Sequence, residues 1–273
     1  FFPGGDIGSL AVNGTVNDLA VMGAKPLYLS CGLILEEGLE MTVLERVLFS
    51  IKNACKEADV KVVTGDTKVV ERGSVDRMFI NTSGIGILEY PVQRKVIKPG
   101  DQIIISGSIG DHGISIMAQR SGLSFSQGLQ SDCAPLNQMI GRVLKKFPDS
   151  IKFMRDATRG GVASVLNEIV HNKSFAAVLV EERFPLKDAV KGVCEILGID
   201  PLYAANEGKV VMVVEKKAAN QILHILKQCR EGKNAAIIGE IVGQYKGVVY
   251  VETQIQGKRM LPLLLEEQLP RIC

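Results

Sequence analysis

The sequence predicts a mixed α/β protein built from two domains. The chain has 273 residues, of which 46% are hydrophobic, so it can form two cores of ordinary size. Segments of β-strand composition alternate along the chain with segments whose apolar residues recur at helical spacing. No internal repeat or low-complexity tract is present. Two mixed α/β layers are therefore favoured over a helical bundle or an all-β sandwich.

The first domain is expected to span residues 1–90. A helix beginning near Ile7 should end at Gly23, because glycine followed by Pro26 is a common stop signal. Apolar residues then recur at spacings of three and four over 41–58, which is typical of an amphipathic helix. The strands expected in this domain are 27–35, a short run at 60–63 that ends in Thr64-Gly65-Asp66, and 78–88.

The second domain is expected to span residues 91–256, after a boundary rich in proline and glycine. Its expected helices lie near 111–121, 136–147, 160–172, 187–198 and 217–230, and its expected strands at 102–106, 176–181, 209–215 and within 235–252. From 257 to 273 the sequence changes character. Pro262 and Pro270 interrupt any long helix there, so we expect an extended, mobile tail that carries the terminal Cys273.

The composition excludes several classes of function. With 32 basic and 30 acidic residues the formal net charge is only +2, which gives no electrostatic footprint for nucleic acid or an anionic membrane. No apolar run reaches the roughly 18 residues that a membrane-spanning helix needs, so we expect a soluble, cytoplasmic protein. The six cysteines form no C-x-x-C pair, which argues against a zinc site or a disulfide framework.

The common catalytic signatures are also missing. No glycine-lysine pair has the context of a phosphate-binding P-loop. Gly84-Ile85-Gly86 lies inside an expected strand and lacks the third glycine of a dinucleotide-binding fingerprint. No G-x-S-x-G elbow is present, so a serine hydrolase is poorly supported.

Carboxylates near helices and glycines are the remaining chemical signal in the first domain. Asn17 and Asp18 lie in an otherwise apolar helix, where a carboxylate needs a partner, either a cation or a lysine. Asp66 and Thr67 follow a β-run directly, with Lys68 nearby, so Asp66 is expected to project at the end of a strand or to cap a turn. Such residues fit the ligands of a hard cation beside phosphate.

The second domain contributes two further candidates. Asp156, Thr158, Arg159, Gly160 and Gly161 precede an expected helix, whose first backbone N–H groups could bind an anion together with the arginine. Asp156 could equally cap that helix. Glu207 is the second candidate. It precedes a glycine between two strand-like runs, where it is either a positioned base or a turn residue.

Read together, these segments resemble the HypE family of carbamoyl dehydratases, within the AIR-synthetase-like (PurM-like) ATP-binding superfamily. The likeness covers essentially the whole chain, and the terminal P-R-I-C is its most specific part. The segments that carry it are Gly4-Gly5-Asp6-Ile7-Gly8, Thr15 to Ala20 with Gly23-Ala24-Lys25-Pro26, Val63 to Val70, Gly110-Asp111-His112-Gly113, Ser131 to Asn137, Met154 to Asp156 with Thr158-Arg159-Gly160-Gly161, Ala205 to Lys209, and Glu267 to Cys273. Family members carry a further segment before the position of Phe1, so we expect one here.

The resemblance implies a two-domain PurM-like fold in which the first domains of a homodimer form a barrel and the second is an α/β sandwich. It implies that HypF loads a carbamoyl group on Cys273, that ATP and Mg²⁺ then drive its dehydration to a thiocyanate, and that the cyano group passes to iron on the HypC–HypD complex for a [NiFe] hydrogenase. By position, Glu207 is the candidate base and Lys68 stabilises developing charge. Asp18 and Asp66 are the candidate metal ligands. The residues expected to bind the nucleotide are Asn17, Asp18, Asp66, Thr67, Asp156, Thr158, Arg159, Gly160 and Gly161.

Two alternatives stay open at this point. Another synthetase of the superfamily, of the selenophosphate or aminoimidazole ribotide type, would also activate its substrate with ATP, but a tail ending in cysteine has no role in it. A non-catalytic scaffold of the maturation complex would bind the partners without turnover. Hydrolysis of ATP that depends on Cys273 and on a carbamoyl donor distinguishes all three.

Overall fold

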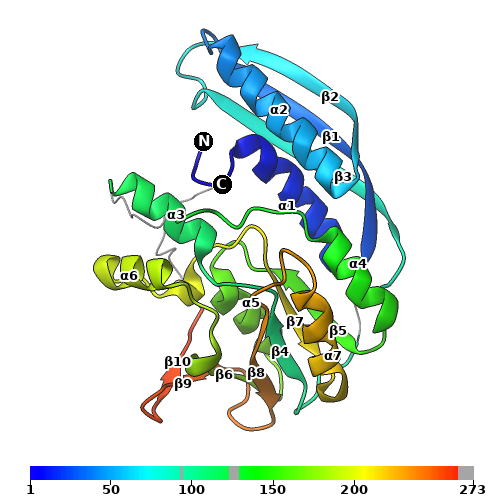
Figure 1. The fold of residues 1–273 in the computed structure, drawn as a ribbon, viewed down its shortest axis with the longest axis vertical. Coiled ribbons are helices and arrows are strands. Elements are labelled where there is room, and N and C mark those ends of the chain that lie inside the picture. Colours follow the sequence, from blue (N-terminus) through cyan, green and yellow to red (C-terminus); the bar gives the residue numbers. More distant parts are fainter. Residues whose placement is uncertain (93–94, 123–128, 264–273) are drawn as a thin grey trace.

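The computed structural model describes residues 1–92, 95–122 and 129–263, which form two sheets with helices packed on them (Figure 1). The first sheet has the order β2-β1-β3 and the second the order β10-β9-β6-β8-β4-β7-β5. The helices are α1 (Ile7–Val21), α2 (Met41–Ala58), α3 (Asp111–Arg120), α4 (Asn137–Lys146), α5 (Gly161–Val170), α6 (Asp188–Leu197) and α7 (Lys216–Lys227). The strands are β1 (Ala24–Glu36), β2 (Lys61–Val70), β3 (Met78–Leu88), β4 (Gln102–Ile105), β5 (Ile151–Asp156), β6 (Ala176–Val180), β7 (Val210–Val214), β8 (Ala236–Val242), β9 (Val249–Glu252) and β10 (Lys258–Met260).

The first sheet is covered by helices on one face. Helix α1 starts at a capping box, in which the Asp6 side chain accepts from the backbone N–H groups of Gly8 and Ser9. Figure 1 shows α1 and α2 lying across the sheet formed by β1, β2 and β3. The residues that build this core are Val12, Val16, Leu29, Leu33, Val47 and Ile51. Alternate residues of β1 and β3 therefore point at the helices, and their neighbours point away.

The opposite face of the first sheet is exposed and carries large apolar side chains on β1 and β3. Phe79, Ile85 and Ile87 of β3 lie on it, with exposed fractions of 50%, 66% and 58%. Tyr28 and Ile34 of β1 are their cross-strand partners, paired with Ile85 and Phe79 respectively. Between these two pairs the register places Ser30 opposite Ser83 and Gly32 opposite Asn81, so the apolar side chains form two separate groups on this face. Exposed apolar groups of this kind are candidates for an interaction surface.

The second sheet has a core on each face. Ile103 and Ile105 of β4 pack with Leu166 of α5, whereas the intervening Ile104 packs with α4 and α7. This alternation is the period of two expected for a strand buried on both sides. Ala20 and Val21, at the end of α1, belong to the α4 and α7 core, so the two domains share packed side chains.

Several elements differ from the sequence-based expectations. Strand β2 continues to Val70 because it pairs in parallel with β1 along its length, so Asp66 lies within the strand and not at its end. Strand β1 starts at Ala24 and accommodates Pro26 next to an irregularity in its register with β3. Strand β5 was not expected at all.

The predicted tail also starts later than expected. Residues 258–260 form β10, paired with β9, and Leu261 is fully buried. The Leu261 carbonyl accepts from the Asn167 side chain at 2.8 Å and the Pro262 carbonyl from the Tyr203 hydroxyl at 2.7 Å. Residues 264–273, including Cys273, lie outside the described residues. Within the described part of the chain, no helix combines the length and the apolar character needed to cross a membrane.

Candidate functional site

Two carboxylates meet where α1 passes the end of β5. Asp18 lies on the exposed side of α1, and Asp156 is the last residue of β5. Partial burial of the Asp18 carboxyl and the nearby charge of Asp156 raise the pKa of Asp18, and Arg155 opposes this shift. The sequence-based candidates Asp18 and Asp156 are thus brought together. Their like charges would be relieved by a cation.

The turn after Asp156 is shaped by a side-chain bond and two glycines. The Thr158 hydroxyl donates to Asp156 Oδ2 at 2.8 Å, so Asp156 orders this turn and does not cap α5. Gly160 and Gly161 have φ of +65° and +59°. A Cβ on Gly161 would also lie 2.5 Å from two carbonyl oxygens. Arg159 is exposed beside the first N–H groups of α5, an arrangement suited to an anion.

Glu207 is buried just before β7 and is linked to α1 through Asn17. The Asn17 side chain donates to the Glu207 carbonyl at 3.2 Å and to the Ala134 carbonyl at 3.1 Å, and its oxygen accepts from Leu136 N at 2.7 Å. Asn17 is itself buried, and these three hydrogen bonds orient the chain around Glu207. Its expected contact with a nucleotide stays a prediction. Asn17 and Asp18 are consecutive on α1, but Asn17 is buried whereas Asp18 is exposed, so the two side chains lie on different sides of the helix.

A thiol that sequence reasoning did not place in the site lies near Glu207. Burial raises the pKa of Cys133 to about 12, the Asn13 amide that donates to its sulfur opposes this, and the charge of Glu207 raises it further. Cys133 is therefore a neutral thiol at physiological pH and a poor nucleophile. In the sequence, only the family resemblance of the segment from Ser131 to Asn137 pointed to this part of the site.

Asp66 and Lys68 lie elsewhere in the chain. In the β1–β2 register Asp66 is paired with Gly32 and Lys68 with Ile34, so both share the outer row of the first sheet. Asp18 lies on a helix that packs on the inner face. The structure therefore does not join Asp18 and Asp66 within one chain. Across the ranges that it describes, no group of three or more His, Cys, Asp or Glu side chains is arranged to hold a metal ion.

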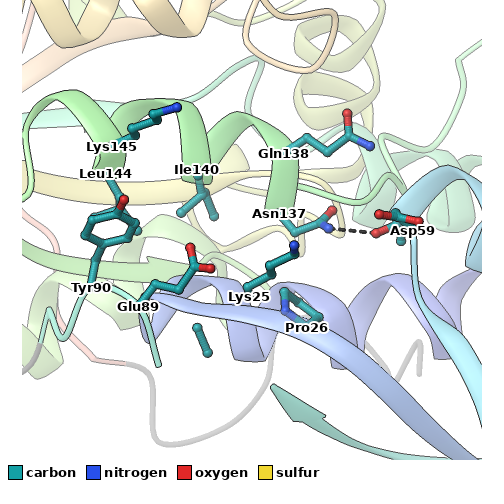
Figure 2. A pocket seen from close by; sticks show the side chains of 14 residues that line it. Lys25, Pro26, Asp59, Glu89, Tyr90, Asn137, Gln138, Ile140, Leu144 and Lys145 are labelled. Atoms are coloured by element: carbon teal, nitrogen blue, oxygen red, sulfur yellow. Dashed lines mark hydrogen bonds between the residues drawn. The ribbon is translucent and has the colours of Figure 1, made fainter. Parts of the chain in front are cut away.

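A pocket of about 310 Å³ lies between the two domains, away from these residues. Figure 2 shows Lys25 and Glu89 of the first domain facing Asn137 and Ile140 of α4. The Asn137 amide donates to the Ala58 carbonyl at 2.8 Å. None of the predicted site residues lines this pocket, so it is not the cavity in which they act.

His112 is fully buried beside the Glu207 region. Its Nδ1 bonds to the Ser131 hydroxyl at 2.8 Å, and its ring makes an edge-to-face contact with the ring of Phe2. Its Nε2 has no hydrogen-bond partner among the described residues. Burial lowers the pKa of His112 and the charge of Asp132 opposes that shift, so the imidazole is neutral in the folded protein.

A pH dependence of stability follows from the buried imidazole. Because the pKa of His112 is lower in the folded state than the unfolded value of 6.5, the unfolded chain binds the extra proton, and stability is lost as the pH falls below that value. The free energy of unfolding, measured with urea from neutral pH downwards, should fall less steeply for His112→Asn than for the wild type. The difference in slope should be up to about 1.4 kcal/mol per pH unit. The exposed His224→Asn is the control. Parallel curves for the wild type and His112→Asn would refute the assignment.

Comparison with known proteins identifies the fold and the family. Residues 1–88 match the model of the AIR synthase related protein N-terminal domain, and residues 98–252 match that of its C-terminal domain. The carbamoyl dehydratase HypE of Bradyrhizobium diazoefficiens is 46% identical over 100% of this chain and 80% of its own length. These matches confirm the predicted fold class.

Two solved structures are similar over nearly the whole chain. HypE in complex with ATP is 47% identical, with a TM-score of 0.94 over 100% of this chain and 83% of its own. HypE in the HypE–HypF complex is 49% identical, with a TM-score of 0.91 over 96% of this chain and 86% of its own. The chain therefore belongs to the HypE carbamoyl dehydratase family of AIR synthase related proteins.

Proposed function

We propose that this chain catalyses the ATP-dependent dehydration of an S-carbamoyl group on Cys273 to a thiocyanate, which supplies the cyanide ligands of the iron in [NiFe] hydrogenases. The observation that carries the proposal is the 46% identity, over the whole chain, to relatives named carbamoyl dehydratase. The terminal cysteine in the sequence and the buried Glu207 supply the two groups that the reaction needs.

ATP and Mg²⁺ are the proposed cosubstrate and cofactor. A similar HypE has been solved with ATP, which supports nucleotide binding here. Asp18 and Asp156 fit Mg²⁺, because this ion prefers oxygen donors and in nucleotide sites needs only one or two carboxylates besides phosphate and water. Burial is the main reason that the pKa of Asp18 is raised, the charge of Asp156 raises it further, and Arg155 opposes the shift. When bound, Mg²⁺ offsets charge on the transferring phosphate. Thr158, Arg159, Gly160 and Gly161 are the proposed phosphate contacts.

The chemistry follows from the weakness of an amide oxygen as a leaving group. The carbamoyl oxygen attacks the γ-phosphorus of ATP, which forms a C–O–P linkage and releases ADP. The C–O bond then breaks, phosphate leaves, and loss of the N–H protons completes the C≡N bond. Glu207 is the proposed base for a proton on nitrogen, and Lys68 would stabilise the developing negative charge.

A homodimer is part of the proposal. Asp66, Thr67 and Lys68 lie on the exposed first sheet, apart from Asp18, so the proposed nucleotide site is incomplete in one chain. Pairing of two such sheets through their outer faces would cover Phe79 and Ile85. We infer that the second copy supplies the missing groups.

The dimer is tested by placing a charge on that face. Ile85→Glu should turn the protein into a monomer, since an unpaired carboxylate would be buried in the interface. Light scattering after size-exclusion chromatography measures the mass. Ile196→Glu on α6 is the matched control, because Ile196 is 64% exposed and Ile85 is 66% exposed. A dimeric Ile85→Glu, or a monomeric wild type, would contradict this interface.

The proposed partners are HypF for loading the carbamoyl group and the HypC–HypD complex for accepting the cyano group. A solved HypE–HypF complex of a similar chain supports the first. The function is tested by incubating the full chain with HypF and its carbamoyl donor, then adding ATP. The terminal peptide should gain a carbamoyl group and then lose one water. A peptide that keeps its carbamoyl mass points to a scaffold, and ATP hydrolysis without any carbamoyl donor points to another synthetase of the superfamily.

A further inference from the structure

A short segment between α3 and α4 presents a buried carboxylate to the backbone of Glu207. Asp132 Oδ1 accepts from Glu207 N at 3.1 Å, and Oδ2 accepts from Gly208 N at 3.2 Å. The Lys209 ammonium lies 3.1 Å from Oδ2, and both side chains of this ion pair are more than nine-tenths buried. One carboxylate therefore holds three successive residues.

Asp132 carries its charge in this setting. Burial alone would favour the neutral acid, but Lys209 and the hydrogen bond from the Glu207 amide hold the pKa of Asp132 below its usual range. The Lys209 ammonium also donates to the Gly208 carbonyl at 3.0 Å, which directs this cation to the turn that contains Glu207. The buried charges of Asp132 and Lys209 thus compensate each other.

The Asp132 segment is itself fixed from the other side. The Ser131 hydroxyl accepts from Cys133 N at 3.0 Å and bonds to His112 Nδ1 at 2.8 Å. The fit to the Glu207 turn is close, because a Cβ on Gly208 would lie 1.9 Å from the Asp132 carbonyl oxygen. The Asp132 segment is therefore held by contacts of its own, in addition to those with the Glu207 turn.

We propose that Asp132 is a positioning residue for the dehydration step, which holds the Glu207 turn so that the Glu207 carboxylate meets the nitrogen of the carbamoyl group. The proposal rests on the function proposed above, in which Glu207 is the base. A base acts only within hydrogen-bond reach of the proton that it removes, and a displacement of about 1 Å costs on the order of 10²-fold in rate.

The test uses the full chain, carbamoylated on Cys273, with single-turnover formation of thiocyanate followed by mass spectrometry. Asp132→Asn keeps an acceptor for Glu207 N but presents N–H groups to Gly208 N and Lys209. The rate constant should fall roughly 10- to 100-fold, with the KM for ATP within about twofold of the wild type. Asp101→Asn is the matched control, because Asp101 is a buried carboxylate that accepts from a backbone N–H, that of Lys98, outside this region.

A double variant separates positioning from stability. Asp132→Asn with Lys209→Met removes the unpaired ammonium, so it should regain thermal stability but not the rate of dehydration. A folded Asp132→Asn with the wild-type rate overturns the inference, and so does a rate that returns with stability in the double variant. If Glu207→Gln is slow while Asp132→Asn is not, this inference alone fails. If Glu207→Gln keeps the wild-type rate, the proposed base is wrong.

Discussion

Replacing Glu207 with glutamine is expected to slow dehydration of the carbamoylated chain by about 10²- to 10⁴-fold, the usual contribution of a general base. The substitution keeps the shape of the side chain, and the contacts of Asn17 and Asp132 with this residue are made to its backbone, so the turn should stay in place. Glutamine cannot accept the proton from nitrogen. ATP affinity should be unchanged, because no phosphate contact is assigned to Glu207. Mass spectrometry of the terminal peptide, sampled over time after ATP is added, gives the rate.

The control for this prediction is Glu195→Gln, an identical chemical change on the exposed side of α6. It should convert the carbamoyl group at the wild-type rate. Both variants should hydrolyse no ATP before loading. Formation of thiocyanate by Glu207→Gln at the control rate would remove Glu207 from the mechanism.

The elements that matched the expectations are those whose pattern is local. The apolar residues of α2 recur at spacings of three and four, and β3 is a long β-rich run. Their bounds were therefore predicted as 41–58 and 78–88, and the structure has the same bounds. Strands β5 and β10 were missed because their sequences, IKFMRD and KRM, contain too many charges to be read as strands. Pairing determines both strands: β5 pairs with β7, which is distant in sequence, and β10 forms a hairpin with the preceding β9.

The candidate site was predicted from the sequence less completely than the fold. The sequence indicates that Asp18, Asp66 and Asp156 are unusual, but not which of them meet. Asp156 joins Asp18 because the end of β5 lies beside α1, whereas the parallel register with β1 turns Asp66 to the outer face. Asp132 was not singled out, because an acidic residue in a loop has no local signature of burial. Only the fold shows that it holds the Glu207 backbone.

Replacing Cys273 with alanine should abolish carbamoyl loading completely. The reactive form of cysteine is the thiolate, and the other thiols are poor substitutes. Burial raises the pKa of Cys194 to about 11 and that of Cys133 to about 12, and it also raises the pKa values of Cys31 and Cys55. Cys229 is buried in the core. In the proposed reaction, the thiol of Cys273 is the one on which HypF loads the carbamoyl group.

The measurement is the mass of every cysteine-containing peptide after incubation with HypF, its carbamoyl donor and ATP. Wild-type chain should carry the carbamoyl group, or the cyano group formed from it, on the peptide that ends in Cys273, and Cys273→Ala should carry neither group on any peptide. Cys31→Ala is the control, since it removes a partly exposed thiol from the first sheet and should load normally. Because Cys273 is not among the proposed nucleotide contacts, Cys273→Ala should still bind ATP with wild-type affinity. Loading of Cys273→Ala at another cysteine would show that the carrier is internal, and the pKa values of Cys133 and Cys194 make that outcome the least expected.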